Sequence, residues 1–280
     1  MIRFSRYLWL YACISGLVLV PGIFSLIRYG LHPSIDFTGG TLLEVSYDTP
    51  PAASDVLSAT KTNTNTYIFR IKPGDPVNVA GQGARVLRSE MVGPVLGREL
   101  LVKASVASGM AIFGIFFYVA WAFKNIKFGA SAIIALIHDL LVMLGTFSLF
   151  GLWWGAQADT LFVTAFLTTM SFSIHDTIVV FDRIREYGRR DDRTPFDQIA
   201  DRALGETMSR SLVNSFTIVF MLLALLLMGG VTIRWFVAAL MVGTISGTYS
   251  SPFVATPILI LWDRWEKRKS TPDSRRTRLG

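Results

Sequence analysis

Residues Thr160–Phe181 read TLFVTAFLTTMSFSIHDTIVVF, a mainly apolar stretch that contains one His-Asp pair, His175 and Asp176. A helix needs about 20 predominantly apolar residues to cross about 30 Å of hydrocarbon, so this stretch predicts a membrane span. A charged side chain at the centre of a span costs about 3 kcal/mol on insertion scales, and it usually faces a bundle interior or a water-filled path. The same stretch therefore indicates a membrane fold and a candidate functional group inside it.

Further apolar runs lie on both sides of this stretch. The chain of 280 residues is 51% hydrophobic and only 17% charged, whereas soluble proteins carry about 25% charged residues, which disfavours disorder and an ordinary soluble enzyme. The first run has basic residues before it but is too long for a signal peptide and lacks a cleavage site, so we interpret it as an uncleaved anchor. The six expected spans are roughly Tyr7–Ile27, Val106–Phe123, Phe128–Phe150, Thr160–Phe181, Ser211–Met228 and Trp235–Trp262.

Basic residues beside the spans predict the orientation, because cytoplasmic loops carry an excess of Lys and Arg. Of the two short turns on the opposite side, one has no Lys or Arg and the other has only Arg234. We therefore expect both termini in the cytoplasm. The basic residues are Arg3, Arg6, Lys124, Lys127, Arg183, Arg185, Arg189, Arg190, Arg193, Arg264, Lys267, Arg268 and Lys269.

These patterns divide the chain into four expected parts. Residues 1–29 hold the cytoplasmic N-terminus and the first span, residues 30–105 an external, periplasmic α/β domain, residues 106–262 a five-helix bundle with a cytoplasmic loop at 182–210, and residues 263–280 a cytoplasmic tail. The 182–210 loop is expected to be an amphipathic surface helix or a hairpin. In the insert we expect strands at Thr41–Tyr47 and Tyr67–Lys72, a short helix at Ala52–Thr60, a loop at Pro73–Gly83 and a helix at Ser89–Ala104 that is interrupted near Gly93-Pro94.

Titratable residues inside the expected spans are the candidate functional groups. His138 and Asp139 lie near the middle of the third span, and His175 and Asp176 lie in the fourth. Because a short turn joins these spans, we expect them to be antiparallel neighbours whose His-Asp pairs face each other. Arg210, at the cytoplasmic start of the fifth span, is the expected positive partner of Asp176.

Two roles are open to these groups. A carboxylic acid in a low dielectric beside an arginine can load and release a proton, and imidazole can do so near neutral pH. The alternative is a static polar lock between helices. We favour the relay for Asp176 and the lock for His138 and Asp139, and His175 fits either role; Arg210 can also snorkel to lipid phosphate. Asp182 and Arg183, at the membrane boundary, are expected to be interfacial anchors.

The sixth span is rich in small residues. The spacing of Gly243 and Gly247 permits close helix approach, either as static packing or as a sliding interface, and Pro252 and Pro257 predict a kink. The single cysteine, Cys13, excludes a disulfide framework and a cysteine-based metal site.

Several motifs occur along the chain in a recognisable order. They are Ile35–Gly40 (IDFTGG), Val92–Leu100 (VGPVLGREL), Ala135–Asp139 (ALIHD), Phe172–Glu186 (FSIHDTIVVFDRIRE), Ser209–Leu212 (SRSL) and Gly247–Ser251 (GTYSS). On these motifs the chain resembles the SecF branch of the SecD/SecF family of protein-export membrane proteins, within the resistance–nodulation–division superfamily. The family motif residues other than those already named as titratable map onto Asp36, Gly39, Gly40, Gly93, Pro94, Asp182 and Arg183.

The resemblance implies six spans with an external domain after the first, and a heterodimer with SecD in the bacterial inner membrane. It implies use of the proton motive force to promote preprotein translocation through SecYEG. The family's membrane carboxylate maps onto Asp176 and its arginine onto Arg210, while a further aspartate belongs to SecD. No covalent chemistry, cofactor, metal or nucleic acid is implied; the expected contacts are SecD, SecYEG, unfolded preprotein and the lipid bilayer.

Three departures from the family pattern stand out. His175 occupies a position that is usually Asn and adds a titratable group beside Asp176. Pro252 replaces the usual aliphatic residue, and the external insert is shorter than in many relatives.

Three other functions are open to a chain with these sequence features. A small-molecule or lipid exporter subunit of the same superfamily is the main alternative, although such chains usually carry two six-span halves. An intramembrane hydrolase is disfavoured because the chain has no Gly-x-Ser-x-Gly elbow or Gly-x-Gly-Asp pair. A bare scaffold for SecD is the third alternative.

Overall fold

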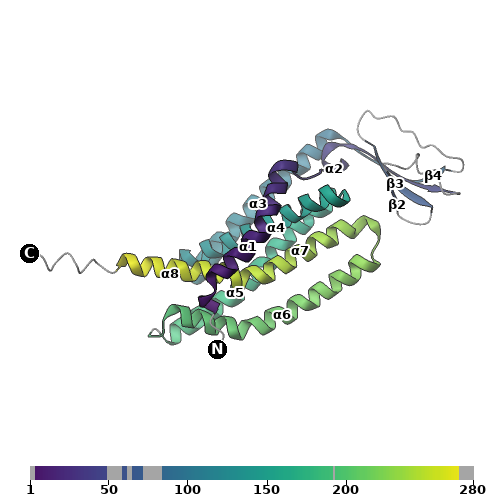
Figure 1. Cartoon of the computed structure of the whole chain (residues 1–280). Helices are drawn as coiled ribbons and strands as arrows, with labels where there is room; N and C mark the ends of the chain where they lie inside the picture. The colour runs from purple at the N-terminus through teal and green to yellow at the C-terminus, as the bar shows by residue number, and fades with distance from the viewer. Residues whose placement is uncertain (1–3, 49–58, 62–64, 72–83, 192, 271–280) are drawn as a thin grey trace, which may run out of the picture.

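A computed structural model of the chain describes residues 4–48, 59–61, 65–71, 84–191 and 193–270. Within that part of the chain, six helical segments are long and apolar enough to cross a membrane. They form an elongated bundle with a small sheet at one end, and the start of α1 and the end of α8 lie toward the other end (Figure 1). The expected class, six membrane helices with a small α/β domain between the first and second, is confirmed.

The helices of the bundle extend beyond the apolar runs predicted from the sequence. α5 continues past Phe181 and α6 begins well before Ser211, so the segment expected to be a surface helix or hairpin consists mainly of helical extensions of the two spans. The elements are η1 (Phe4–Arg6), α1 (Leu8–Tyr29), α3 (Pro94–Phe123), α4 (Ile126–Trp154), α5 (Thr160–Arg190), α6 (Phe196–Met228), η3 (Val231–Ile233), α7 (Arg234–Ser250), the π-helical turn η4 (Ser251–Ala255) and α8 (Thr256–Ser270).

The four-stranded sheet is antiparallel, with strand order β2-β3-β1-β4. Its alternating side chains pair across β1 and β3 (Leu43 opposite Phe69, Val45 opposite Tyr67) and form a small apolar core with Tyr47. The elements between α1 and α3 are α2 (Ile35–Thr38), β1 (Gly40–Tyr47), β2 (Ala59–Lys61), β3 (Thr66–Ile71) and β4 (Ala84–Val92).

Two of the expected elements of the insert match the structure and one is wrong. β1 and β3 confirm the expected strands, although Lys72 lies outside the described residues. The helix expected from Ser89 is wrong in its first part, because Ala84–Val92 pairs with β1 as a strand and Pro94 begins the helix. The expected helix over residues 52–58 and the expected loop at 73–83 lie outside the described residues, and Ala59 and Thr60 belong to β2.

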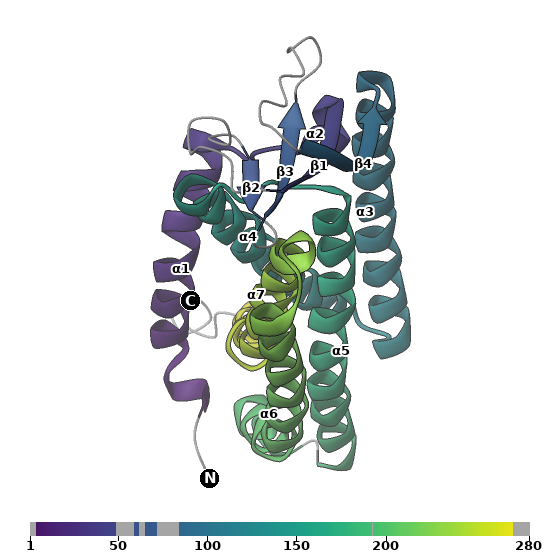
Figure 2. The same cartoon turned by 90° about the vertical axis from the view of Figure 1, so that its right-hand side faces the viewer.

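Two glycines of α7 allow this helix to pack closely against α5. A Cβ added at Gly243 of α7 would lie 2.9 Å from the Thr169 Cβ of α5, and one at Gly247 would lie 3.1 Å from the Ser173 Cα. The close approach expected from the Gly243 and Gly247 spacing is therefore confirmed. Figure 2 shows α7 in front of the bundle, with α1 and α3 on its two flanks.

The sixth span changes its helical pattern at Pro252. α7 ends at Ser250, a single π-helical turn follows, and α8 begins at Thr256. Proline has no N–H to donate to the preceding turn, and π-turns are common places for a break in a long helix. Pro252 lies in this π-helical turn and Pro257 lies in the first turn of α8, while the kink expected from these prolines stays a prediction.

Candidate functional site

The polar groups inside the bundle form two centres on neighbouring faces of α5. Ser173 and Thr177 face inward toward α4 and α7, while Asp176 faces α6. His175 is exposed and, together with Asp176, lines the small cavity between α5, α6 and α7. The two His-Asp pairs therefore do not face each other as expected, because the turn of the helix presents Ser173, not His175, to the third span.

Asp139 is the fully buried centre. Its carboxylate is 0% exposed and accepts hydrogen bonds of 2.6 Å from three hydroxyl groups. The His138 Nδ1 lies 3.1 Å from the same carboxylate. The three hydroxyls belong to Ser173 of α5 and to Ser246 and Ser250 of α7. One carboxylate on α4 therefore ties three helices together.

Asp176 is the half-buried centre. Its Oδ2 accepts a hydrogen bond of 2.9 Å from the Ser211 hydroxyl of α6. It also lines a cavity of about 20 Å³ between α5, α6 and α7, together with the polar side chains of Asn214 and Thr248. A cavity of this volume is large enough for a single water molecule. Asp176 therefore combines one protein donor with space for one water.

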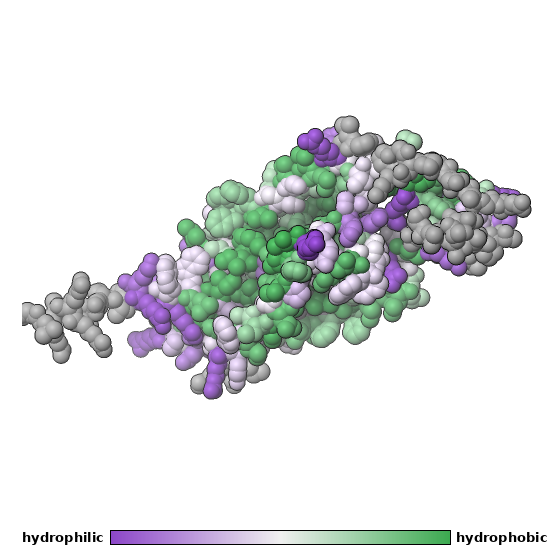
Figure 3. All heavy atoms as spheres, turned by 45° about the horizontal axis from the view of Figure 1, so that its top comes forward, coloured by the Kyte–Doolittle hydropathy of each residue, from purple (hydrophilic) through white to green (hydrophobic). Residues whose placement is uncertain are grey.

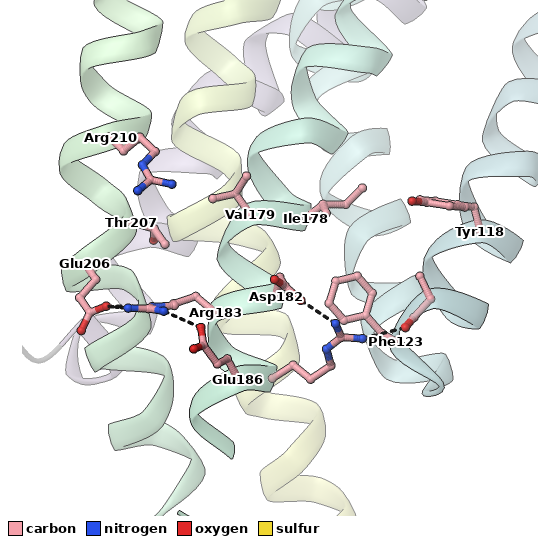
Figure 4. Close-up of a pocket in the computed structure, with 12 residues that line it drawn as sticks. Tyr118, Phe123, Ile178, Val179, Asp182, Arg183, Glu186, Glu206, Thr207 and Arg210 are labelled. Atoms are coloured by element: carbon pink, nitrogen blue, oxygen red, sulfur yellow. Dashed lines mark hydrogen bonds and ion pairs between the residues drawn. The ribbon is translucent and has the colours of Figure 1, made fainter. Parts of the chain in front are cut away.

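Arg210 lies nearer the end of the bundle that is remote from the sheet, and it does not pair with Asp176. Among the described residues it makes no ion pair, and its side chain is exposed. It lines a larger pocket of about 520 Å³ between α3, α5 and α6, together with Tyr118, Thr207 and the residues of the boundary network described next (Figure 4). The expected ion pair is thus replaced by the hydrogen bond to Ser211, the residue that follows Arg210 on α6.

A charged network joins α5 and α6 at the end of the bundle that is remote from the sheet. Arg183 pairs with Glu186 and with Glu206, and the Tyr187 hydroxyl donates to Glu206 (Figure 4). Arg185 donates to the Ala122 carbonyl at 2.8 Å and to Asp182 at 2.7 Å. Asp182 and Arg183, expected to be interfacial anchors, are engaged in these protein contacts, and the link between Arg183 and Glu206 joins α5 to α6.

The N-terminal end of α5 is capped by two carboxylates. The Asp159 side chain accepts from the Phe162 N–H at 2.7 Å, and the Asp36 Oδ2 accepts from both the N–H and the hydroxyl of Thr160 at 3.0 Å. The first free N–H groups of a helix attract acceptors and negative charge. Burial, and secondarily the neighbouring Asp36, raises the pKa of Asp159.

The two family glycines make the turn between Asp36 and the sheet. Gly39 has φ 76° and Gly40 has φ 146°, a range that L side chains rarely adopt. A Cβ at Gly40 would also lie 2.5 Å from the Ile71 carbonyl oxygen. Gly93 and Pro94 are the N-cap and first residue of α3, where proline loses no helical hydrogen bond.

Sequence reasoning missed the hydroxyl and acidic partners of these groups. Ser246 and Ser250 are spaced by one helical turn, a pattern that indicates a common face. Ser173, Ser211 and Glu206 also contact groups on other helices, and these contacts depend on how each helix is rotated about its axis. Among the described residues, no group of three His, Cys, Asp or Glu side chains is placed to hold a metal ion.

The surface is that of a membrane protein. Figure 3 shows a broad apolar region over the middle of the molecule, with hydrophilic residues gathered toward its two ends. The chain is therefore a multi-pass membrane protein.

Comparison with known proteins agrees with this architecture. Residues 76–265 match the model of the C-terminal region of the protein export membrane proteins SecD and SecF, and residues 24–51 match the SecD/SecF GG motif. Similar curated proteins include the protein translocase subunits SecF of Thermobaculum terrenum (38% identical, covering 94% of this chain and 94% of that protein) and Anaerolinea thermophila (37% identical, covering 95% and 97%).

Two solved SecDF structures have a fold similar to that of this chain. The crystal structure of SecDF from Thermus thermophilus, described as a translocon-associated membrane protein, aligns with a TM-score of 0.79 at 28% identity over 94% of this chain. SecDF in its super-membrane-facing form aligns with a TM-score of 0.76 at 28% identity over 96% of this chain. This chain spans 39% of each of those longer chains. The family models, the relatives along nearly the whole chain and the shared fold together show that this chain belongs to the SecD/SecF family of protein export membrane proteins, on its SecF side.

Proposed function

We propose that this chain is the SecF-type subunit of a protein translocase, and that it works with SecD to use the proton motive force for preprotein translocation through SecYEG. The SecDF structures support a SecD partner, because this chain aligns with only 39% of a SecDF chain. The role is that of an accessory translocase subunit with no covalent chemistry. We place it in the bacterial inner membrane with both termini in the cytoplasm and the sheet outside.

The observation that carries the proton-driven part of the proposal is the setting of Asp176. This carboxyl group is half-buried at membrane depth, has one hydroxyl donor and borders a cavity with room for one water. A carboxylate held by several donors is fixed in its ionised form, whereas one with a single donor and nearby water can exchange its proton. Asp176 is therefore the proposed proton carrier.

His175 and Arg210 are proposed to act on either side of this group. The His175 imidazole is exposed beside Asp176 and lines the same cavity. Arg210 lies in the cytoplasmic pocket without an ion-pair partner among the described residues. A small movement of α6 against α5 would bring its positive charge closer to Asp176 and favour release of the proton inward.

Asp139 and His138 have a different proposed role. The Asp139 carboxylate is fully enclosed and holds three hydroxyl donors, so it fits a polar lock between α4, α5 and α7. A lock here gives α5 a fixed support on one side while its Asp176 side remains free to change partners. A proton relay through His138 and Asp139 is the alternative, and it predicts that Asp139→Asn loses proton conduction while its thermal stability is kept.

The available energy is sufficient for such a step. One elementary charge crossing 100 mV supplies about 2.3 kcal/mol, whereas one hydrogen bond contributes about 1 kcal/mol net. The passage of a single proton can therefore exchange the bond between Ser211 and Asp176 for another arrangement of the two helices.

The test is Asp176→Asn in the complex with SecD, reconstituted with SecYEG in proteoliposomes. We expect the stimulation of preprotein translocation by an imposed proton gradient to be lost while SecD still co-purifies. Asp191→Asn, in the exposed turn between α5 and α6, is the matched control and should keep the stimulation. Full stimulation by the Asp176 variant would remove this group from the mechanism.

An exporter of small molecules or lipids, built on the same superfamily fold, is the second candidate. It predicts that deletion of the chain changes resistance to toxic compounds or lipid export, and that secretion of preproteins is unaffected. The similarity to curated SecF proteins along nearly the whole chain favours the translocase role.

A further inference from the structure

The segment that leads from the first span to the sheet is bound to the turn before α5. The Ser34 N–H donates to the Ala158 carbonyl and the Ala158 N–H donates to the His32 carbonyl, both at 2.7 Å. Asp36 then accepts from the N–H and the hydroxyl of Thr160 through a single carboxylate oxygen. Four hydrogen bonds thus join this segment to the outer end of α5 and the turn before it.

Only a short piece of chain separates this attachment from the sheet. Asp36 lies in α2, and the glycine turn at Gly39 leads directly into β1, which pairs with both β3 and β4. α2 is also pressed against α3, since a Cβ at Gly97 would lie 2.7 Å from the Asp36 carbonyl oxygen. A movement of Asp36 therefore reaches the central strand of the sheet without passing through a long loop.

α5 connects this attachment to the proposed proton carrier. It is one continuous α-helix from Thr160 to Arg190. At 1.5 Å per residue, Asp176 lies about 24 Å along the axis from Thr160. Because the helix is continuous, a shift of α5 at Asp176 displaces its capped outer end as well.

We propose that Asp36 is a positioning residue that couples α5 to the external sheet, so that a displacement of α5 during proton transfer moves the sheet. This inference rests on the proposed function of Asp176. Asp36 takes no part in proton transfer itself. Its role is to hold Thr160 through an oxygen that accepts two hydrogen bonds.

The chemistry of the contact predicts which substitutions preserve it. Asn at this position keeps a carbonyl oxygen that can accept from both Thr160 donors, whereas Ala removes the acceptor. Thr164→Val is the matched control, because the Thr164 hydroxyl lies one turn further along α5 and bonds only the Thr160 carbonyl of its own helix. The three variants therefore separate loss of the coupling from loss of a polar group on this surface.

The experiment compares two activities of the complex with SecD in proteoliposomes, namely proton conduction and gradient-stimulated preprotein translocation. We expect Asp36→Ala to retain proton conduction and to lose at least about tenfold in stimulated translocation, the effect expected for the loss of two hydrogen bonds to a charged acceptor. Asp36→Asn and Thr164→Val should stay within about twofold of the unmodified complex in both activities.

The outcomes are distinguishable from failure of the proposed function. If Asp176→Asn leaves both activities unchanged, the proposed proton carrier is wrong; hydrogen exchange of the Thr160 amide then still reports whether Asp36→Ala opens the contact. Unchanged translocation in Asp36→Ala overturns the coupling. Equal loss of both activities, or an Asn variant as impaired as the Ala variant, overturns it as well.

Discussion

The Ser211 hydroxyl on α6 donates a hydrogen bond of 2.9 Å to the Asp176 carboxylate on α5, and within the described residues it is the one side-chain donor to that group. The position of α6 relative to α5 therefore sets the environment of Asp176. Arg210 precedes Ser211 in the chain, so the donor and the positive charge move together on the same helix.

Ser211→Ala tests this relationship. Removal of the donor costs about 1 kcal/mol, which corresponds to about a fivefold change in the equilibrium between two arrangements of the helices. We expect a change of this size in gradient-stimulated translocation. Ser209→Ala, on the exposed side of the same turn, is the control and should have no effect. An unchanged rate in the Ser211 variant would contradict a role for this contact.

Asp139 is expected to govern stability. Asp139→Ala leaves three serine hydroxyls without their shared acceptor, and each buried unsatisfied group costs about 1–3 kcal/mol. We expect a marked drop in the apparent Tm of the purified protein in detergent, with a smaller drop for Asp139→Asn. If the Asn variant keeps the apparent Tm but loses proton conduction, Asp139 belongs to the relay and the lock is wrong.

The glycine contact between α5 and α7 predicts a steric effect. Gly243→Ala places a methyl group 2.5 Å from the Thr169 Cγ2, and the short branched side chain of Thr169 has little room to move away. Such overpacking costs about 1–3 kcal/mol. Gly114→Ala on α3 is the matched control, since a Cβ there meets nothing within 4 Å. We expect a lower apparent Tm for the first variant only.

The N-terminal cap of α5 predicts a pH effect on stability. Burial raises the pKa of Asp159 above its usual value, so the folded state holds this proton more tightly than the unfolded state. This contribution to stability is present below the ordinary pKa of aspartic acid and is lost as the pH rises through the raised pKa of the folded state.

Asp159→Asn should remove this component and still cap the helix, because Asn is an equally good N-cap residue. The measurement is the apparent Tm of both proteins across the acidic range. We expect the difference, variant minus unmodified protein, to increase as the pH rises through this window. A constant difference would show that Asp159 does not titrate differently on folding.

The spans and the central strands follow from local patterns, which explains why the sequence predicts them. An apolar run such as Phe128–Phe150 must be helical in a bilayer, because every backbone N–H needs a partner within its own segment. The alternation of Leu43, Val45 and Tyr47 likewise indicates one face of a strand. The position of β4 does not follow, because its pairing with β1 is formed across a long stretch of chain.

The sequence predicts which residues form the site, but it does not predict which groups they contact. Asp139 and Asp176 are recognisable as candidate functional residues from the sequence alone, because an ionisable side chain inside a membrane span is costly and usually has a functional role. Which groups they contact depends on how each helix is rotated about its axis. A rotation of one residue, about 100°, exchanges Ser173 for Ile174 at the interface with α4, and sequence alone does not fix that rotation.

The short glycine turn after Asp36 limits how many residues can separate Asp36 from β1. The stretch between the contact with Thr160 and the first residue of β1 holds only Phe37, Thr38 and Gly39. One inserted residue would reverse which side chains of β1 reach the small core, since neighbouring residues in a strand point to opposite faces. We therefore expect that an epitope tag inserted in this stretch disrupts the fold, and that relatives of this chain carry no insertions there.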